Sequence, residues 1–325
     1  MKIWTSLTLS ALLLSTLAAP VFAQTSAFPS KPITIVVPFP PGGVSDQLAR
    51  GIGQKLAESL KTTVLVDNRP GGGAQIAANL VKNAPADGYT MFIGDIGAYA
   101  LNPSLYGKLT YDPLKDFTPV ARLVLAPSLL VVPQASPFKA AQDLISTLKA
   151  KSRDVTVASQ STGAGGHLFA EMLRSKTNGR ITHVPYKGSA PALTDLVGGQ
   201  VDLFFDPIIT SGPFVKDARL RALAIGTDQR VPAFDNIPTL EEVGLGDINL
   251  IAWFGLAVKA GTPPEIVKQL SAESIKAIQQ QELSSRFVSQ GLQIAPMGSD
   301  EFRAFIVSES SRWARVIRQA GVRLD

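Results

Sequence analysis

The order of apolar and polar positions in the opening part of the chain predicts strands and helices in alternation. Residues 33–37 are a short β-branched run with turn residues on both sides, which is typical of a buried strand. Apolar residues then recur every four positions over residues 44–60, as in a helix that packs on a sheet. Residues 63–66 and 91–93 have the pattern of two further strands, with a short helix between them. This alternation predicts a parallel sheet with helices on its faces.

A longer apolar run, residues 123–132, separates this series from a second one. Pro127 breaks the run, which could be a strand that crosses between two lobes, and residues 251–258 could cross back. The pattern between them again alternates, and helices are expected from residue 264 onwards. We therefore expect an α/β protein with two αβ lobes, two crossing strands and a cleft. Lobe 1 would comprise residues 28–126 and 250–325, and lobe 2 residues 127–249.

The first 23 residues have the pattern of a secretory signal peptide. Lys2 supplies the positive start, residues 7–19 are a short apolar segment, and residues 21–23 form a small-residue cleavage site. A membrane anchor is the alternative, but the apolar segment is shorter than the ~20 residues that a span needs, and Pro20 closes it. We therefore expect cleavage of the signal peptide and a soluble protein in the periplasm.

Composition adds three constraints. Apolar residues make up 45% of the chain and charged residues 18%, which supports a full core and argues against a disordered chain. The net charge is +5, but the basic residues are scattered, so a nucleic-acid partner is not expected. The chain has no cysteine, so we expect neither disulfides nor a lipidated N-terminal cysteine.

Two glycine-rich loops stand where a predicted strand leads into a predicted helix. One contains Gly42 and Gly43, after prolines at positions 38, 40 and 41, and the other is residues 163–166. In a parallel sheet such loops lie at the carboxyl ends of the strands, where the first turn of each helix offers unpaired amide groups and a partial positive charge. Glycine lets a ligand approach this backbone, so the loops predict a cradle for a carboxylate. The alternative is a pair of tight turns that bind nothing.

Motifs for other chemistries are missing or weak. The chain has no phosphate-binding P-loop, no G-x-G-x-x-G fingerprint after these strands and no G-x-S-x-G nucleophile elbow. His167 and Glu171 are four residues apart on one predicted helix and could bind a metal with His183. A structural histidine beside a salt-bridged glutamate is the favoured interpretation. Asp46, in a first helical turn, is expected to act mainly as a helix cap.

Several other side chains have two open interpretations. Asp95 and Asp206 each end a predicted strand, where they are either ordinary turn acids or contacts for a ligand hydroxyl or amine. No spacing pairs them as catalytic acid and base. Trp253 and Phe254 are expected in the core, and Lys187 either faces the cleft or lies in a solvated loop.

A series of ordered motifs runs from residue 37 to residue 267. They are VPFPPGG-x-x-D-x-x-AR (37–50), DNRPGGG (67–73), PADGYT (85–90), HVPYKGSAPAL-x-DL-x-GGQVDLFFD (183–206), LRALAIG (220–226), IPTLEE-x-G (237–244), W-x-GL (253–256) and GTPPEIV (261–267). Together they resemble the motifs of the periplasmic receptors of tripartite tricarboxylate transporters, the TctC or Bug family. The resemblance covers essentially the whole chain after the expected signal peptide.

The resemblance implies a type II periplasmic-binding-protein fold and a monomeric solute receptor, without enzymatic activity, cofactor or metal. Such a receptor would capture a small organic anion (a mono-, di- or tricarboxylate, an aromatic acid or an amino acid) and deliver it to a tripartite tricarboxylate-type permease. The ligand-binding positions that the resemblance implies are Phe39, Pro41, Gly42, Gly43, Ser45, Asp46, Ala74, Gln75, Asp95, Ile96, Gly97, Ser161, Thr162, Gly163, Gly165, Gly188, Ala190 and Asp206.

The sequence departs from the family pattern at a few of these positions. Asp95 stands where a small hydroxyl residue is usual, and Ser161 and Ala164 also differ from the common residues. From Asp95 alone we hypothesise that the far end of the ligand is a hydrogen-bond donor. The residues by themselves leave two other functions open: a periplasmic enzyme that acts on a small carboxylate through Asp46, Asp95 or His167, and a receptor of an ABC-type importer.

Overall fold

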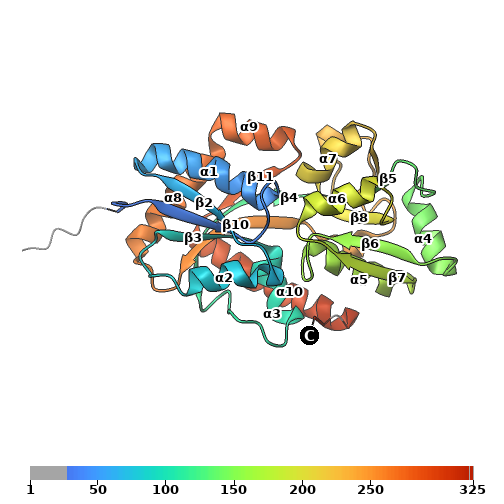
Figure 1. Ribbon diagram of the computed structural model, residues 1–325, viewed down its shortest axis with the longest axis horizontal. Helices are drawn as coiled ribbons and strands as arrows, with labels where there is room; N and C mark the ends of the chain where they lie inside the picture. The colour runs from blue at the N-terminus through green and yellow to red at the C-terminus, as the bar shows by residue number, and fades with distance from the viewer. Residues whose placement is uncertain (1–27, 322, 325) are drawn as a thin grey trace, which may run out of the picture.

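The computed structural model describes residues 28–321, 323 and 324, and the expected signal peptide, residues 1–23, lies outside this part of the chain. Within the described residues the chain forms two β-sheets side by side, each covered by helices (Figure 1). The α/β class that the alternating pattern predicts is confirmed. None of the helices in the described residues has the length and apolarity that a membrane span requires.

The first sheet has the strand order β11-β4-β10-β3-β1-β2. β1 pairs in parallel with β2 and β3, as the opening alternation predicts, whereas β10 is antiparallel to β3 and β4. Its strands are β1 (Ile33–Val37), β2 (Val64–Asn68), β3 (Thr90–Asp95), β4 (Phe117–Ala126), β10 (Ala252–Lys259) and β11 (Gln293–Met297). Its helices are α1 (Val44–Leu60), α2 (Gln75–Lys82), α3 (Asn102–Leu105), α8 (Pro264–Gln279), α9 (Gln281–Ser289) and α10 (Ser299–Ala320), with a π-helical turn, η2, at Gly97–Leu101.

The second sheet has the order β7-β6-β8-β5-β9. β6 is parallel to β7 and β8, and β5 is antiparallel to β8 and β9. The strands are β5 (Ser128–Pro133), β6 (Val155–Ser159), β7 (Ile181–Pro185), β8 (Leu203–Pro207) and β9 (Leu220–Ile225), and the helices are α4 (Ala141–Ala150), α5 (Gly165–Thr177), α6 (Ser189–Val197) and α7 (Ile208–Lys216).

The chain passes between the two sheets beside the two apolar runs, but neither run is itself a crossing strand, since β10 lies wholly in the first sheet. The first run is not one strand, because β4 ends at Ala126 in the first sheet and β5 begins at Ser128 in the second. Pro127, between them, has no amide hydrogen to donate to a ladder, and its carbonyl oxygen accepts from the Ile208 amide instead. The chain returns through residues 249–251 into β10.

The four-residue repeat in α1 has the predicted consequence for packing. Val44, Leu48, Ile52 and Leu56 are all buried against the first sheet, and Leu60 at the end of the helix is partly exposed. The stripe therefore fixes α1 on the sheet and aims its first turn at the second half of the molecule (Figure 1).

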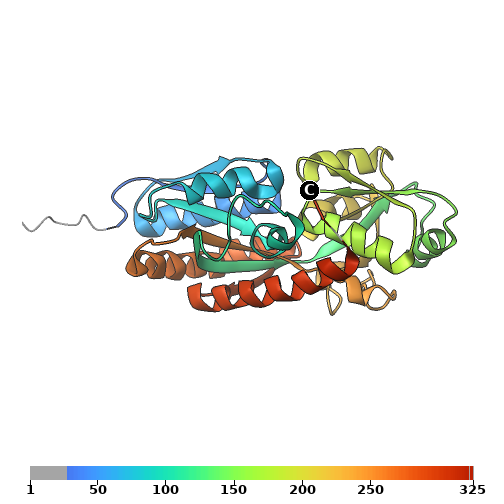
Figure 2. The ribbon, with the colours of Figure 1, turned by 90° about the horizontal axis from the view of Figure 1, so that it is seen from below.

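Helix α10 runs along the first sheet, and its C-terminal part reaches α5 beside the second sheet (Figure 2). A buried carboxylate anchors it to β10. Glu309 accepts hydrogen bonds from the indole nitrogens of Trp253, at 3.2 Å, and Trp313, at 3.1 Å. The Trp253 ring also stacks on Tyr99, with 5.9 Å between ring centroids. The expectation that Trp253 lies in the core is confirmed, since only 1% of it is exposed.

Glycine at position 255 makes close packing of β10 possible. A Cβ at Gly255 would lie 2.8 Å from the carbonyl oxygen of Ala121 and would overlap the ring of Phe302. We therefore expect Gly255→Ala to lower the free energy of unfolding by about 1–3 kcal/mol, measured by urea denaturation. Gly298→Ala is the matched control, because nothing lies within 4 Å of a Cβ there. Equal stability of the two variants would contradict this packing.

Candidate functional site

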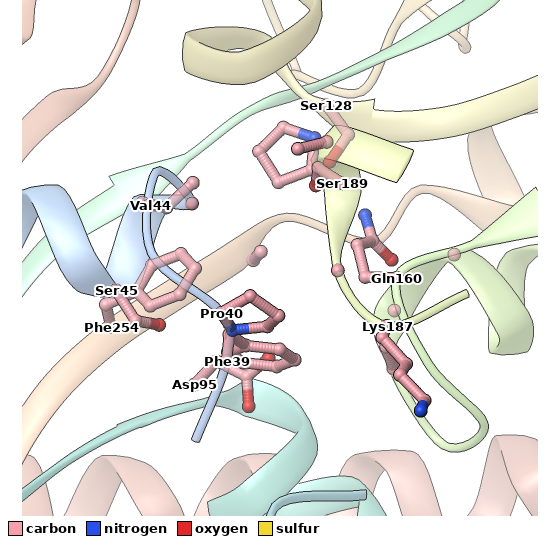
Figure 3. A pocket seen from close by; sticks show the side chains of 18 of the residues that line it. Phe39, Pro40, Val44, Ser45, Asp95, Ser128, Gln160, Lys187, Ser189 and Phe254 are labelled. Carbon is pink, nitrogen blue, oxygen red and sulfur yellow. The ribbon is translucent and has the colours of Figure 1, made fainter. Parts of the chain in front are cut away.

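A cavity lies between the two sheets and contains about 700 Å³ of empty space, part of which is open to solvent. Its walls come from the loop before α1 and from β10 on one side, and from the loops before α5, α6 and α7 on the other (Figure 3). Of the predicted ligand-binding residues, the cavity is lined by Phe39, Pro41, Gly43, Ser45, Asp95, Ile96, Gly165, Gly188 and Ala190.

The N-terminus of α1 forms one wall of this cavity. Gly43 is the N-cap residue, with φ −76° and ψ 176°, and no side chain caps the helix. The first-turn amides therefore have no partner within the helix. The Gly43 backbone is extended, so any residue could adopt it. The nearest atom to a Cβ at Gly43 would be the Pro40 carbonyl oxygen, 3.9 Å away, so glycine here leaves the helix end open.

The N-terminus of α5 repeats this geometry from the other sheet. Ala164 is its N-cap residue, with φ −72° and ψ 166°, again without a side-chain cap. Gly165 and Gly166 follow in the first turn and line the cavity. A Cβ at Gly166 would lie 3.1 Å from the Phe205 carbonyl oxygen, so the helix starts in close contact with β8. The two glycine-rich loops thus both lead, through an extended N-cap residue, into a helix without a side-chain cap, as their similar sequences predict.

A third helix N-terminus, that of α6, lies at the same cavity. Its N-cap residue Gly188 has φ 107°, in the left-handed region that favours glycine, and no side chain caps this helix either. A Cβ at Gly188 would lie 3.2 Å from Cδ of Pro40. The loop before α6 therefore packs directly on the loop before α1, and the two halves of the molecule touch at the cavity.

Three uncapped helix termini give the cavity a preference for an anion. Each terminus stabilises a nearby negative charge by about 0.3–1 kcal/mol, and by up to ~2 kcal/mol when partly buried. The walls are otherwise mostly apolar, as at Val44, Leu250 and Phe254, so little water screens these partial charges. No described residue that lines the cavity is an arginine, and the lining cation is Lys187, an exposed side chain. The backbone thus supplies most of the positive potential.

Two buried polar atoms in the cavity wall have no hydrogen-bond partner among the described residues. They are Oγ of Ser45 and Oε1 of Gln160. Because an unpartnered buried polar atom costs about 1–3 kcal/mol, both are suited to contact a ligand or an ordered water molecule. Ser45 belongs to the predicted set, whereas Gln160 does not.

Asp95 lines the same cavity from the end of β3. The residue is 8% exposed, and its Oδ1 accepts from the Ala98 amide, in the π-helical turn, at 3.0 Å. Burial raises the pKa of the Asp95 carboxyl, and the backbone amides of Ala98 and Gly97 act against that rise. Of the two interpretations of Asp95, an ordinary turn acid exposed to solvent is therefore wrong, and contact with a ligand stays a prediction.

Asp46 lies in the first turn of α1, as expected, but it holds the loop before the helix and caps no first-turn amide. Its Oδ2 accepts from the Gly42 amide at 3.0 Å, its Oδ1 accepts from Nδ2 of Asn68 at 3.1 Å, and it pairs with Arg50 at 2.9 Å. Burial alone would raise its pKa, but the hydrogen bonds from Arg50, Gly42 and Asn68 hold that pKa below the usual value. Asp46 does not line the cavity, and it shapes the loop that does.

Asp206 lies behind the cavity wall. It is fully buried and accepts from Oγ of Ser189 at 2.6 Å and from Nε2 of Gln160 at 3.2 Å. Ser189 and Gln160 both line the cavity, so Asp206 holds two wall residues in place. Burial raises the pKa of the Asp206 carboxyl to about 7.

The remaining predicted residues lie beside the main cavity. Ala74, Gly97, Ser161 and Gly163 line a smaller cavity that shares Phe39, Asp95 and Ala164 with the main one. Gly42, Asp46, Gln75, Thr162 and Asp206 line neither cavity. Direct ligand contact by any residue of the predicted set stays a prediction.

Sequence reasoning missed several wall residues. Ser128 enters from the start of β5, Gln160 from the loop after β6, and Pro207 from the N-cap position of α7. Phe254 is buried as expected for a core residue, and it also lines the cavity. Since neighbours on a strand face opposite sides, the position of Trp253 in the core could have indicated that Phe254 faces the cleft.

The two histidines support the loop before α5. Their rings stack, with 3.8 Å between centroids; Nδ1 of His167 accepts from the Gly163 amide, and Nε2 of His183 lies 2.6 Å from Oγ of Ser159. Burial lowers the pKa of His167 to about 3 and that of His183 to about 4, so both rings are neutral. The described residues contain no group of three side chains suited to bind a metal.

The raised pKa of Asp206 predicts a pH dependence of stability. The folded state holds the proton up to about pH 7, whereas the unfolded state releases it near pH 3.8, the ordinary pKa of an aspartate. Protonated Asp206 therefore contributes its full stabilisation below the pKa of the unfolded state. This contribution is lost as the pH rises through about 7, the pKa in the folded state. Relative to Asp206→Asn, the natural protein should lose roughly 2–3 kcal/mol of unfolding free energy between pH 5 and pH 8. Denaturant titrations of both proteins measure this; a constant difference would refute the assignment.

Comparison with known proteins agrees with this geometry. The model of the tripartite tricarboxylate transporter family receptor matches residues 48–322. BugT of Bordetella pertussis is 34% identical over 309 residues, which are 95% of this chain and 94% of BugT. An adipate-bound protein of R. palustris superposes with a TM-score of 0.87 at 35% identity, covering 91% of this chain and 100% of that one.

A malate-bound protein, MatC of Rhodopseudomonas palustris, superposes with a TM-score of 0.84 at 32% identity, covering 89% of this chain and 100% of MatC. The two-lobed periplasmic-binding-protein fold implied by the sequence motifs is thereby confirmed. The chain belongs to the tripartite tricarboxylate transporter receptor family, the TctC or Bug proteins.

Proposed function

We propose that this protein is a periplasmic receptor that captures a small organic carboxylate between two lobes and delivers it to a permease of the tripartite tricarboxylate type. One observation carries the proposal: uncapped N-termini of α1, α5 and α6, from both sheets, face a single cavity. Related proteins with this fold bind adipate and malate. Export by a cleaved signal peptide at residues 1–23 and a monomeric receptor are part of the same proposal.

The proposed moving units are residues 28–126 with 250–325, and residues 127–249. Micromolar affinity needs about 8 kcal/mol, which one helix terminus cannot supply. Three termini at up to ~2 kcal/mol each still fall short of this value, so burial of the apolar part of the ligand in the closed cleft must add to them. Ligand contact with both units favours the closed state. Pro127 and residues 249–251, where the chain changes sheets, are the proposed hinge.

An enzymatic function has weaker support. Catalysis of a proton transfer needs an acid or base within reach of the substrate, and His167 and His183 are engaged with Gly163 and Ser159 outside the cavity lining. Asp95 lines the cavity without a catalytic partner among the described residues that line it. Family membership also favours a tripartite-type permease over an ABC-type importer.

A bulky side chain at position 43 is expected to abolish ligand binding. Gly43 and Gly298 are both extended N-cap glycines with free space around a Cβ, but only Gly43 lines the cavity. A carboxylate at 100-fold over its Kd should add about 2.7 kcal/mol of stability to the natural protein and to Gly298→Val, but nothing to Gly43→Val. A thermal-shift screen of mono-, di- and tricarboxylates, aromatic acids and amino acids measures this. Normal binding by Gly43→Val would overturn the proposed cradle.

A hydrogen bond between the proposed units is expected to favour closure. The Tyr106 hydroxyl donates to the Thr162 carbonyl oxygen at 3.3 Å. Removing it in Tyr106→Phe should weaken ligand binding by about 0.5–1.5 kcal/mol, or roughly two- to tenfold in Kd, by calorimetry. Tyr89→Phe is the control, since the Tyr89 hydroxyl bonds to Ser30 within one unit. Equal affinities of the two variants would argue against a closed bound state with this contact.

A further inference from the structure

The two neighbouring cavities differ in the kind of hydrogen bond that they offer. The main cavity is rich in donors, because the first turns of α1, α5 and α6 line it and Lys187 stands at its edge. In the smaller cavity the side chains of Asp95 and Asn102 offer acceptors, and the Ser161 hydroxyl can donate or accept. Phe39, Asp95 and Ala164 belong to both linings, so the two cavities adjoin.

The orientation of the Asn102 side chain is fixed by its surroundings. Its Nδ2 donates to the Gly73 carbonyl oxygen at 2.7 Å and to the Tyr111 hydroxyl at 3.0 Å. The Tyr111 hydroxyl in turn donates to the Ala98 carbonyl oxygen at 2.6 Å, so toward Asn102 it can only accept. These contacts fix the amide nitrogen on the side of Gly73 and Tyr111, so the other polar atom of the side chain is the oxygen, Oδ1. This oxygen is buried, has no partner among the described residues, and belongs to a residue that is 1% exposed.

Asp95 provides the second acceptor of the smaller cavity. Its hydrogen bond from the Ala98 amide uses Oδ1 and leaves capacity on the carboxylate for a further donor. Within the described residues it forms no ion pair, and the groups that favour its charged form are backbone amides. An uncompensated buried carboxylate is costly, which makes it a strong site for a cation.

The size of the smaller cavity limits what can satisfy both acceptors. It has about 180 Å³ of empty space between its walls, and the room left clear of the wall atoms suits one group of about the size of a water molecule. A ligand hydroxyl group has one hydrogen and would leave one of the two acceptors unpartnered. A water molecule, with two hydrogens, can donate to both, and so can a primary ammonium group, with three. Of these two, only the ammonium group also neutralises the carboxylate.

We propose that the ligand is an aminocarboxylate, whose ammonium group enters the smaller cavity between Asp95 and Asn102 while its carboxylate binds the helix N-termini of the main cavity. This inference rests on the proposed receptor function and specifies the substrate class of the same site. The apolar walls at Val44, Leu250 and Phe254 fit a short hydrocarbon segment between the two charged ends. A second carboxylate in place of the ammonium group would face Asp95 as a like charge.

Isothermal titration calorimetry with acids of matched skeleton tests the proposal. The ω-series is 5-aminopentanoate, 5-hydroxypentanoate, pentanoate and pentanedioate, and the α-series is L-2-aminopentanoate, L-2-hydroxypentanoate and pentanoate, each repeated from three to six carbons. In at least one series the amino acid should bind about tenfold or more tightly than its hydroxy, unsubstituted and diacid counterparts. Asp95→Asn should weaken the amino acid by about tenfold or more and pentanoate by less than about threefold.

Asp228→Asn is the charge-matched control, because it removes one carboxylate from an exposed position outside both cavities. It should leave all affinities unchanged. Asparagine at position 95 can still accept from the Ala98 amide, so thermal melting should show a folded variant. The proposal is overturned if a hydroxy acid, an unsubstituted acid or a diacid binds as tightly as, or more tightly than, every amino acid, or if Asp95→Asn weakens all ligands equally. If an acid without an amino group binds most tightly and Gly43→Val abolishes its binding, the protein is a carboxylate receptor but its ligand is not an aminocarboxylate. If no carboxylate binds, both the receptor function and the aminocarboxylate ligand are refuted.

Discussion

Every α-helix leaves the amide groups of its first turn without a partner inside the helix, and this chain brings three such turns to one cavity. No side chain caps α1, α5 or α6. In most proteins a serine, threonine or aspartate at the N-cap position satisfies one of these amides, whereas here the positions hold Gly43, Ala164 and Gly188. The rest of the fold can be understood as the support that keeps these amides open, close together and shielded from water.

The two halves of the molecule provide this support in different ways. In the first half, the apolar stripe of α1 fixes the helix on the sheet, and Asp46 holds the glycine loop by accepting from Gly42 and Asn68. In the second half, the stacked pair of His167 and His183 holds the loop before α5. Of these supporting residues only Val44 lines the main cavity, whose surface is made mostly of backbone and apolar atoms with a few polar side chains such as Ser45, Asp95 and Gln160.

The sequence was informative where one local rule decides the structure. The four-residue stripe of α1, the crossing near Pro127 and the placement of glycine-rich loops at strand ends all follow from periodicity and backbone freedom. It was uninformative where several distant segments meet. β11, residues 293–297, lacks a clear alternation, and α7 contains Pro213 and a continuous apolar start, so neither was predicted.

The same limit applies to the site. Asp206 at a strand end suggested a ligand contact, but only the fold shows that it holds Ser189 and Gln160 instead of lining the cavity. Asn102 was not predicted, because its unpartnered oxygen results from a network with Gly73 and Tyr111 that no spacing reveals.

A crystal structure of the protein with its bound acid would test the central claim most directly. The account predicts carboxylate oxygens about 3 Å from first-turn amide nitrogens of both α1 and α5, so that one acid group joins the two halves of the molecule. A carboxylate held by one half alone, held by Lys187 without these amides, or bound outside the cavity would contradict the account.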